Sequence, residues 1–291
     1  MRRIAIAGVQ MVLGASNNLD SMRHRLDSLM RMFPWVEMVL FSELAPFGSR
    51  RDLAREFPND AERAFQEMAA RQRIWLIPGS MYERKGDDTY NTASVINPQG
   101  EIVTRYRKLF PFYPYESGVA QGDSFCVFEV PHVGRFGLCI CYDLWFPETA
   151  RTLTSMGAEV ILHPVLTSTI DRDIEIAIAQ ATGAMFQTYV VDINGLGMGG
   201  NGRSCVVDPH GRFLHQSSVN EEVIPLHIDL DIARQSREDG IRGLGQMLKS
   251  FRDRHVQFDV YSSRWAGEYL DSLGELEKPK RLVPEPLEEN R

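Results

Sequence analysis

Three apolar segments of the chain each end in a side chain that could act on a carbonyl group. Residues 39–43 (VLFSE) end in the carboxyl group of Glu43, residues 103–108 (VTRYRK) in the amine of Lys108, and residues 136–141 (FGLCIC) in the thiol of Cys141. Each segment reads as a strand, and α/β proteins build their sites at strand ends. We therefore expect these three side chains to lie close together.

A carboxylate, an amine and a thiol are sufficient for nucleophilic cleavage of a carbon–nitrogen bond. The thiol reacts as the thiolate, so a base must take its proton, and a buried carboxylate with a raised pKa can do this. A strand-to-helix turn and nearby cations can lower the pKa of Cys141, so we also expect an accessible thiolate. The oxyanion that forms would be stabilised by an ammonium group and a backbone N–H. This chemistry needs no metal, and we expect no cofactor.

Taken singly, each of these residues has an ordinary explanation. Glu43 alone would be a strand-end or cap residue, Lys108 a surface lysine, and Cys141 a small buried side chain. The chain has no C-x-x-C motif and no cysteine–histidine cluster, which argues against a zinc site. The catalytic interpretation therefore depends on reading the three segments together.

The composition is that of an ordinary globular protein. The chain has 291 residues, 43 % of them hydrophobic and 24 % charged, which suggests one large domain or two small ones. The formal net charge is -7, and no basic stretch carries interleaved aromatic residues, so we expect no nucleic-acid partner. No apolar run is long enough for a membrane span. The first 14 residues read as a buried strand rather than a signal peptide, so we assign the protein to the cytoplasm.

Apolar periodicity predicts alternating strands and helices, which is typical of an α/β protein with helices covering sheets. Helices are predicted over residues 19–32, 60–71, 148–156 and 171–186. Strands are predicted over residues 3–9, 38–41, 74–82, 90–97, 101–105, 124–130, 134–141, 160–163, 189–193, 204–207, 213–216 and 223–228. The pattern leaves open whether there is one sheet or two.

The chain resembles the nitrilase superfamily of carbon–nitrogen hydrolases over roughly residues 3–230. The matching segments are 39–47 (VLFSELAPF), 106–108 (YRK) and 137–148 (GLCICYDLWFPE), supported by 90–94 (YNTAS), 97–100 (NPQG), 190–195 (VVDING) and 200–211 (GNGRSCVVDPHG). The resemblance implies a four-layer α-β-β-α sandwich over residues 1–263, with 264–291 as a C-terminal arm or tail. It also implies a homodimer or higher homo-oligomer, paired through the helix after the nucleophile.

The same resemblance implies residue roles. Glu43 would be the base, Lys108 the oxyanion donor and Cys141 the nucleophile. Glu116, in the loop after Lys108, matches the position at which amidase-type members carry a second glutamate that orients the substrate. The backbone N–H of Tyr142 would be the second oxyanion donor. Asp143 is expected to be a structural cap on the following helix.

Other residues bear on the substrate. We expect the aromatic side chains of Phe112, Tyr115, Tyr142 and Trp145 to line a narrow, apolar pocket that contains few cations. His163 is either a strand-end histidine or a substrate contact. Members that bind acidic substrates often have an arginine where this chain has Leu144 and Trp145, and the segments that carry Arg172 and Arg203 are predicted to be solvated.

These features predict a thiol amidohydrolase that acts on a small, mainly neutral amide through a covalent acyl-enzyme. A nitrilase or an N-carbamoyl amidohydrolase is the alternative within the class. The alternative from another class is a non-catalytic binding protein on the same fold, which would be expected to have lost one of the three reactive residues. Helix 171–186 lacks the Arg–Ala–x–Glu–Asn pattern common in the superfamily, so the sequence does not identify the subfamily.

Overall fold

Buried side chains alternate along the central strands, and this alternation determines how the layers stack. In strands β1 (Arg3–Gln10) and β3 (Met38–Phe41), every second side chain joins one hydrophobic cluster and the intervening ones join another. Ile6 and Leu40 lie in the first cluster, whereas Ala7 and Phe41 lie in the second. A sheet that is apolar on both faces must be covered on both.

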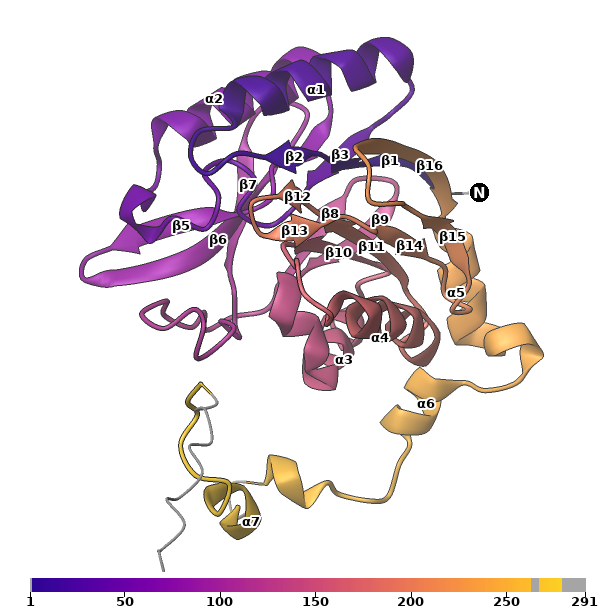
Figure 1. Ribbon diagram of the computed structural model, residues 1–291. Coiled ribbons are helices and arrows are strands. Elements are labelled where there is room, and N and C mark those ends of the chain that lie inside the picture. The colour runs from indigo at the N-terminus through magenta and orange to yellow at the C-terminus, as the bar shows by residue number, and fades with distance from the viewer. Residues whose placement is uncertain (1, 263–266, 279–291) are drawn as a thin grey trace, which may run out of the picture.

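The computed structural model describes residues 2–262 and 267–278, and its elements form a four-layer α-β-β-α sandwich (Figure 1). The first sheet has the strand order β16-β1-β3-β4-β6-β5, with β7 paired to β6. Its further strands are β4 (Trp75–Ile77), β5 (Met81–Lys85), β6 (Asp88–Ile96), β7 (Ile102–Arg107) and β16 (Glu222–Asp229). Helices α1 (Leu19–Met32) and α2 (Asp60–Gln72) cover its outer face, burying Met22, Leu26 and Phe65.

The second sheet lies against the inner face of the first. Its order is β15-β14-β11-β10-β9-β8, from β8 (Cys126–Val130), β9 (Gly134–Leu138), β10 (Val160–Val165), β11 (Tyr189–Asn194), β14 (Cys205–Val207) and β15 (Phe213–Gln216). Phe136, Leu162 and Val191 fill the space between the sheets. Helices α3 (Pro147–Ser155) and α4 (Arg172–Met185) cover the outer face (Figure 1).

The remaining elements are short. A small sheet joins β2 (Val12–Leu13), β12 (Leu196–Gly197) and β13 (Gly200–Asn201). The further helices are α5 (Leu230–Asp239), α6 (Met247–Arg252), α7 (Glu268–Asp271) and the 3₁₀ turns η1 (Arg51–Leu53), η2 (Cys141–Trp145), η3 (Ile241–Gly243) and η4 (Asp259–Tyr261). None of the helices in the described residues has the length and apolar character needed to cross a membrane.

The predicted sandwich is confirmed, and the strands form two main sheets. All four predicted helices are present within one or two residues of their expected ends. Two predicted strands are wrong in extent: residues 74–82 form β4 and β5, separated at Pro78–Ser80, and the strand predicted to reach Cys141 ends at Leu138. The boundary predicted at 263/264, and most of the predicted tail, lie outside the described residues.

The break between β4 and β5 generates a stability prediction. Gly79 has φ +78°, and a Cβ added there would overlap the carbonyl oxygen of Ser42, next to Glu43. Gly86 has φ +60°, with no atom within 4 Å of an added Cβ. We expect Gly86→Ala to cost about 1 kcal/mol of unfolding free energy and Gly79→Ala about 3 kcal/mol, because the second change adds a steric clash to the backbone strain. Chemical denaturation measures both, and equal losses would contradict the proposed clash.

Candidate active site

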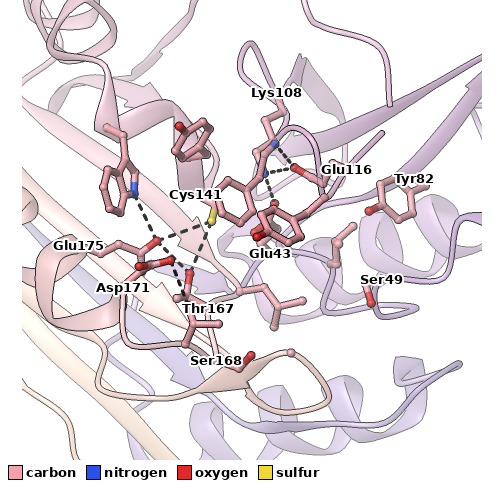
Figure 2. Close-up of a pocket in the computed structure, with 18 residues that line it drawn as sticks. Glu43, Ser49, Tyr82, Lys108, Glu116, Cys141, Thr167, Ser168, Asp171 and Glu175 are labelled. Carbon is pink, nitrogen blue, oxygen red and sulfur yellow. Dashed lines mark hydrogen bonds and ion pairs between the residues drawn. The ribbon is translucent and has the colours of Figure 1, made fainter. Parts of the chain in front are cut away.

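The ends of strands from both sheets meet at one point. The backbone N–H of Glu43, two residues after β3, donates to the carbonyl oxygen of Val165 at the end of β10 (3.2 Å). Lys108 follows β7, where its backbone N–H donates to the carbonyl oxygen of Asn91 (2.8 Å). The side chains of Glu43, Lys108 and Cys141 consequently line one cavity of about 370 Å³ (Figure 2).

The ammonium group of Lys108 is buried between two carboxyl groups. Its Nζ donates to Oε1 of Glu43 at 2.8 Å and to Oε2 of Glu116 at 2.7 Å, and the residue is 1 % exposed. Asn91 Nδ2 also donates to Oε1 of Glu43 (2.8 Å), and the Phe112 N–H donates to Oε2 of Glu116 (2.6 Å). The second glutamate therefore lies beside the lysine, and its role in orienting the substrate stays a prediction.

Burial and charge act on these groups in opposite directions. Burial lowers the pKa of Lys108, but the charges of Glu43 and Glu116 raise it by more. The pKa of Lys108 therefore lies well above its usual value. Burial raises the pKa of Glu43, and the charge of Lys108 offsets this only in part. Lys108 thus stays protonated, while Glu43 holds a proton more readily than an exposed glutamate does.

Cys141 begins the turn η2 rather than ending a strand. Its φ is +47°, a left-handed conformation that is costly for a residue with a Cβ. The carboxyl group of Asp143 stabilises this turn by accepting from the backbone N–H of Ile140 (2.8 Å). It also accepts from the Tyr106 hydroxyl (2.7 Å) and the Phe110 N–H (2.8 Å), which flank Lys108 in the sequence. Asp143 is structural, as expected, but it connects the Cys141 turn to the Lys108 segment instead of capping α3.

The sequence predicted a lowered pKa for the Cys141 thiol, and this is wrong. Burial, and then the charge of Glu43, raise the pKa of the Cys141 thiol well above its usual range, and Lys108 offsets this only in part. Helix α3 begins six residues later, at Pro147, so its N-terminus is not at the thiol. Glu43 and Cys141 line the same cavity, and the sulfur itself lies 3.8 Å from the Thr167 hydroxyl oxygen.

A second carboxyl group, which the sequence analysis did not identify, lies on the other side of the sulfur from Glu43 (Figure 2). Oε1 of Glu175, on α4, is 4.0 Å from Cys141 Sγ, and it accepts a hydrogen bond from the Thr167 hydroxyl at 2.9 Å. Trp145 Nε1 is 3.5 Å from the same oxygen. The departure of helix 171–186 from the superfamily pattern was the one available signal.

His163 does not line the cavity, so the interpretation as a substrate contact is not supported. It is 1 % exposed, and its ring nitrogens lie 2.8 Å from Asp192 Oδ2 and 2.9 Å from the carbonyl oxygen of Cys141. Burial lowers the pKa of His163, but the hydrogen bond to Asp192 and its charge raise it more. Since both partners are acceptors, a protonated ring satisfies both contacts and holds the Cys141 turn from behind.

Arg172 was predicted to lie in a solvated segment, and this is wrong. It is 0 % exposed, pairs with Asp192, and its Nη1 donates to Oε2 of Glu175 at 3.2 Å. Arg203 matches the prediction better, since its side chain is 38 % exposed and pairs with Asp173. Neither arginine lines the cavity.

The four predicted aromatic residues all line the cavity. The Phe112 ring contacts those of Tyr115 and Tyr142, with centroids 5.0 and 4.9 Å apart, and Tyr142 lies 5.8 Å from Trp145. The sequence did not single out the remaining lining residues, which are Leu44, Ser49, Tyr82, Leu166, Thr167, Ser168, Thr169, Asp171, Glu175 and Gly199. Within residues 2–262 and 267–278, no group of three or more histidine, cysteine or acidic side chains could hold a metal ion.

Comparison with known proteins gives a consistent result. A family model described as carbon–nitrogen hydrolase matches residues 3–238. The chain is 27 % identical to the mouse protein named omega-amidase NIT2 over 220 residues (67 % of this chain, 76 % of that protein). It is 30 % identical to a Pyrococcus abyssi protein named nitrilase over 214 residues (71 % and 77 %).

A solved structure has the same fold. It is a mutant of the amidase from Nesterenkonia sp. AN1, with the acetamide moiety of fluoroacetamide added covalently at its active-site cysteine. The TM-score is 0.72 at 20 % identity, covering 82 % of this chain and 95 % of that chain.

The geometry predicts which thiol reacts first. Cys141 lines the cavity, whereas Cys139 and Cys205 are 0 % exposed and Cys126 is 6 % exposed in the core between the sheets. We expect iodoacetamide to label Cys141 before the other three, at a rate that rises with pH because burial keeps the thiol protonated. Peptide mapping over a pH series measures this, and preferential labelling of Cys139 would contradict the assignment of the nucleophile.

Proposed function

The chain belongs to the carbon–nitrogen hydrolase family of the nitrilase superfamily, and we propose that it is an amidase that converts a small amide without a carboxylate to a carboxylic acid and ammonia. The observation that carries the proposal is the convergence of Cys141, Glu43 and Lys108 on one cavity. The ammonium group bridges Glu43 and Glu116 there, with 2.8 and 2.7 Å contacts.

The first half of the reaction forms an acyl-enzyme. Glu43 takes the proton of the Cys141 thiol, and the sulfur attacks the amide carbon. Lys108 has three N–H donors, and its contacts with the two glutamates use two of them, so the third can stabilise the oxyanion together with the backbone N–H of Tyr142. Glu43 then passes its proton to the amide nitrogen, the C–N bond breaks and ammonia leaves.

The second half releases the acid. Glu43, again ionised, takes a proton from a water molecule that attacks the thioester carbon. The thioester bond breaks, and the Cys141 sulfur recovers its proton from Glu43. Across both halves one amide and one water yield one carboxylic acid and one ammonia, and the enzyme is regenerated. In the related amidase fold, the acetamide moiety of fluoroacetamide is attached covalently to the active-site cysteine, which supports a nucleophilic cysteine at this place in the fold.

The contacts of Glu116 favour an amide over a nitrile. Its carboxyl group is fixed by Lys108 and the Phe112 N–H, so it can accept a hydrogen bond from the NH₂ group of an amide. A nitrile has no such donor. A nitrilase or an N-carbamoyl amidohydrolase remains the second candidate within the family, since the Pyrococcus abyssi relative is named a nitrilase.

We also propose a cytoplasmic homo-oligomer, paired through the helix after the nucleophile. That helix is α3, which lies on the outer face of the second sheet (Figure 1). Its outward placement supports this pairing, and its Glu148 and Arg151 also contact Tyr261 and Phe251 of the C-terminal segment. Sedimentation equilibrium measures the assembly, and a monomer at micromolar concentration would contradict the pairing.

Substitution of the nucleophile tests the mechanism most directly. We expect Cys141→Ala and Cys141→Ser to lose at least about 10⁴-fold in kcat, because no other thiol lies in the cavity lining. Far-ultraviolet circular dichroism should match that of the unaltered protein. Substantial ammonia release by a folded Cys141→Ala protein would refute the acyl-enzyme route.

The pH dependence of kcat/KM should reflect Glu43. Because burial raises its pKa, the base is lost on acidification at a pH above the usual range for glutamate. Activity therefore falls as the pH drops through this raised pKa, whereas Lys108 stays protonated well into the alkaline range. A pH–rate profile measures the acidic limb. A limb in the ordinary glutamate range would mean that the base is a solvated carboxylate.

A panel of three compounds of one length tests the substrate class. We expect kcat/KM to be higher for butyramide than for succinamate, because Glu116, Asp171 and Glu175 line the cavity and would repel a substrate carboxylate. Butyramide should also exceed butyronitrile, because Glu116 can hold the amide NH₂ group. A preference for succinamate would indicate an omega-amidase-type pocket, and a preference for butyronitrile would contradict the role of Glu116.

A further inference from the structure

The cavity has a strong excess of negative charge. Four carboxyl side chains line it, those of Glu43, Glu116, Asp171 and Glu175, and among the described lining residues Lys108 is the one cation. Lys108 is already held by Glu43 and Glu116 at 2.8 and 2.7 Å. Asp171 and Glu175 therefore face the cavity with no cation of the lining set beside them.

The carboxyl group of Glu175 lies close to the sulfur at which a substrate must react. Its Oε1 is 4.0 Å from the nucleophilic sulfur, a contact long enough for a stronger donor to replace the thiol. The Thr167 hydroxyl and the Trp145 indole N–H orient this oxygen at 2.9 and 3.5 Å. The other oxygen is held from behind by Arg172, which also pairs with Asp192 and is 0 % exposed. Glu175 is thus fixed with one oxygen directed at the substrate.

Aromatic rings supply a second attraction for a cation in the same place. Tyr142 and Trp145 line the cavity beside Glu175, with ring centroids 5.8 Å apart. The faces of such rings attract ammonium groups. One ring of the lining already does so, since the ammonium nitrogen of Lys278 lies 5.0 Å from the centroid of Tyr115.

We propose that the preferred substrate is a short amide that carries an ammonium group, and that Glu175 is the residue that selects it. This inference rests on the amidase function proposed above and narrows its substrate class. The 4.0 Å separation between Oε1 and the sulfur limits the distance between the scissile carbonyl and the ammonium to a short carbon chain. The ammonium would donate to Oε1 of Glu175 while the amide NH₂ group faces Glu116 on the opposite side.

Three amides with the same two-carbon spacer test the proposal. They are 3-aminopropanamide, butyramide and succinamate, which place an ammonium, a methyl and a carboxylate group at the same position. We expect kcat/KM to be at least about tenfold higher for 3-aminopropanamide than for butyramide, because the ammonium pairs with a desolvated carboxylate. Succinamate should be the poorest of the three.

The ratio of kcat/KM for 3-aminopropanamide over butyramide is the decisive readout, because it cancels any general loss of activity. Glu175→Gln should lower this ratio at least about tenfold, since the amide keeps the shape of the side chain and removes its charge. Asp171→Asn changes a second residue of the cavity lining, and we expect it to lower the same ratio by less. Asp173→Asn is the matched control: it removes a charge from the same helix, but its side chain is 69 % exposed and outside the lining. The control should keep the ratio within about twofold.

The outcomes separate the two proposals. Equal or better hydrolysis of butyramide by the unaltered enzyme would overturn the selection of an ammonium and leave the amidase function standing. An equal loss on both substrates in Glu175→Gln, with the ratio unchanged, would mean that Glu175 acts on the chemistry and not on selection. Calorimetry with the Cys141→Ala protein adds a measurement without turnover: tighter binding of 3-aminopropanamide than of butyramide supports the proposal, and equal binding overturns it. No hydrolysis of any amide would refute both proposals.

Discussion

The buried ammonium group of Lys108 is the constraint on which the rest of the site depends. An ammonium at 1 % exposure costs several kcal/mol unless opposite charges and hydrogen bonds compensate for the lost water. Compensation comes from Glu43, 65 residues earlier in the chain, and from Glu116 in the following loop. The ends of β3 and β7 and the 110–122 loop must therefore converge. The bond from the Glu43 N–H to Val165 attaches this group to the second sheet.

The same loss of water affects the protonation of the groups around Lys108. It raises the pKa of both Glu43 and the Cys141 thiol, which favours the protonated form of each group. The strained turn at Cys141 needs support in such a site. Asp143 provides it from the Lys108 side, and His163 provides it from the opposite side through the Cys141 carbonyl oxygen. The proposed nucleophile is held by hydrogen bonds to the backbone of its turn, and helix α3 does not begin at the thiol.

The sequence predicted what depends on local periodicity or on strand ends. Helix α1 has the predicted ends at Leu19 and Met32, because its buried residues recur at helical spacing. The end of β9 was missed because the apolar run FGLCIC continues past Leu138, and no pattern encodes the positive φ of Cys141. Arg172 was misjudged because burial of a charge depends on its partner. Asp192 is 20 residues away and reaches it through the packing of α4 on β11.

Two carboxyl groups flank the sulfur, and their cations support the different roles that we propose for them. The partner of Glu43 is Lys108, which also faces the developing oxyanion. When Glu43 takes the thiol proton and becomes neutral, the negative charge reappears on the substrate oxygen, and the same ammonium can stabilise it there. The partner of Glu175 is Arg172, which is held by Asp192 behind the cavity and cannot reach the developing oxyanion. Proton transfer to Glu175 would leave Arg172 without one of its counter-ions and the oxyanion no better stabilised. Glu43 is therefore suited to catalysis, because its cation Lys108 can also stabilise the oxyanion. Glu175 is suited to recognition, because its cation Arg172 cannot.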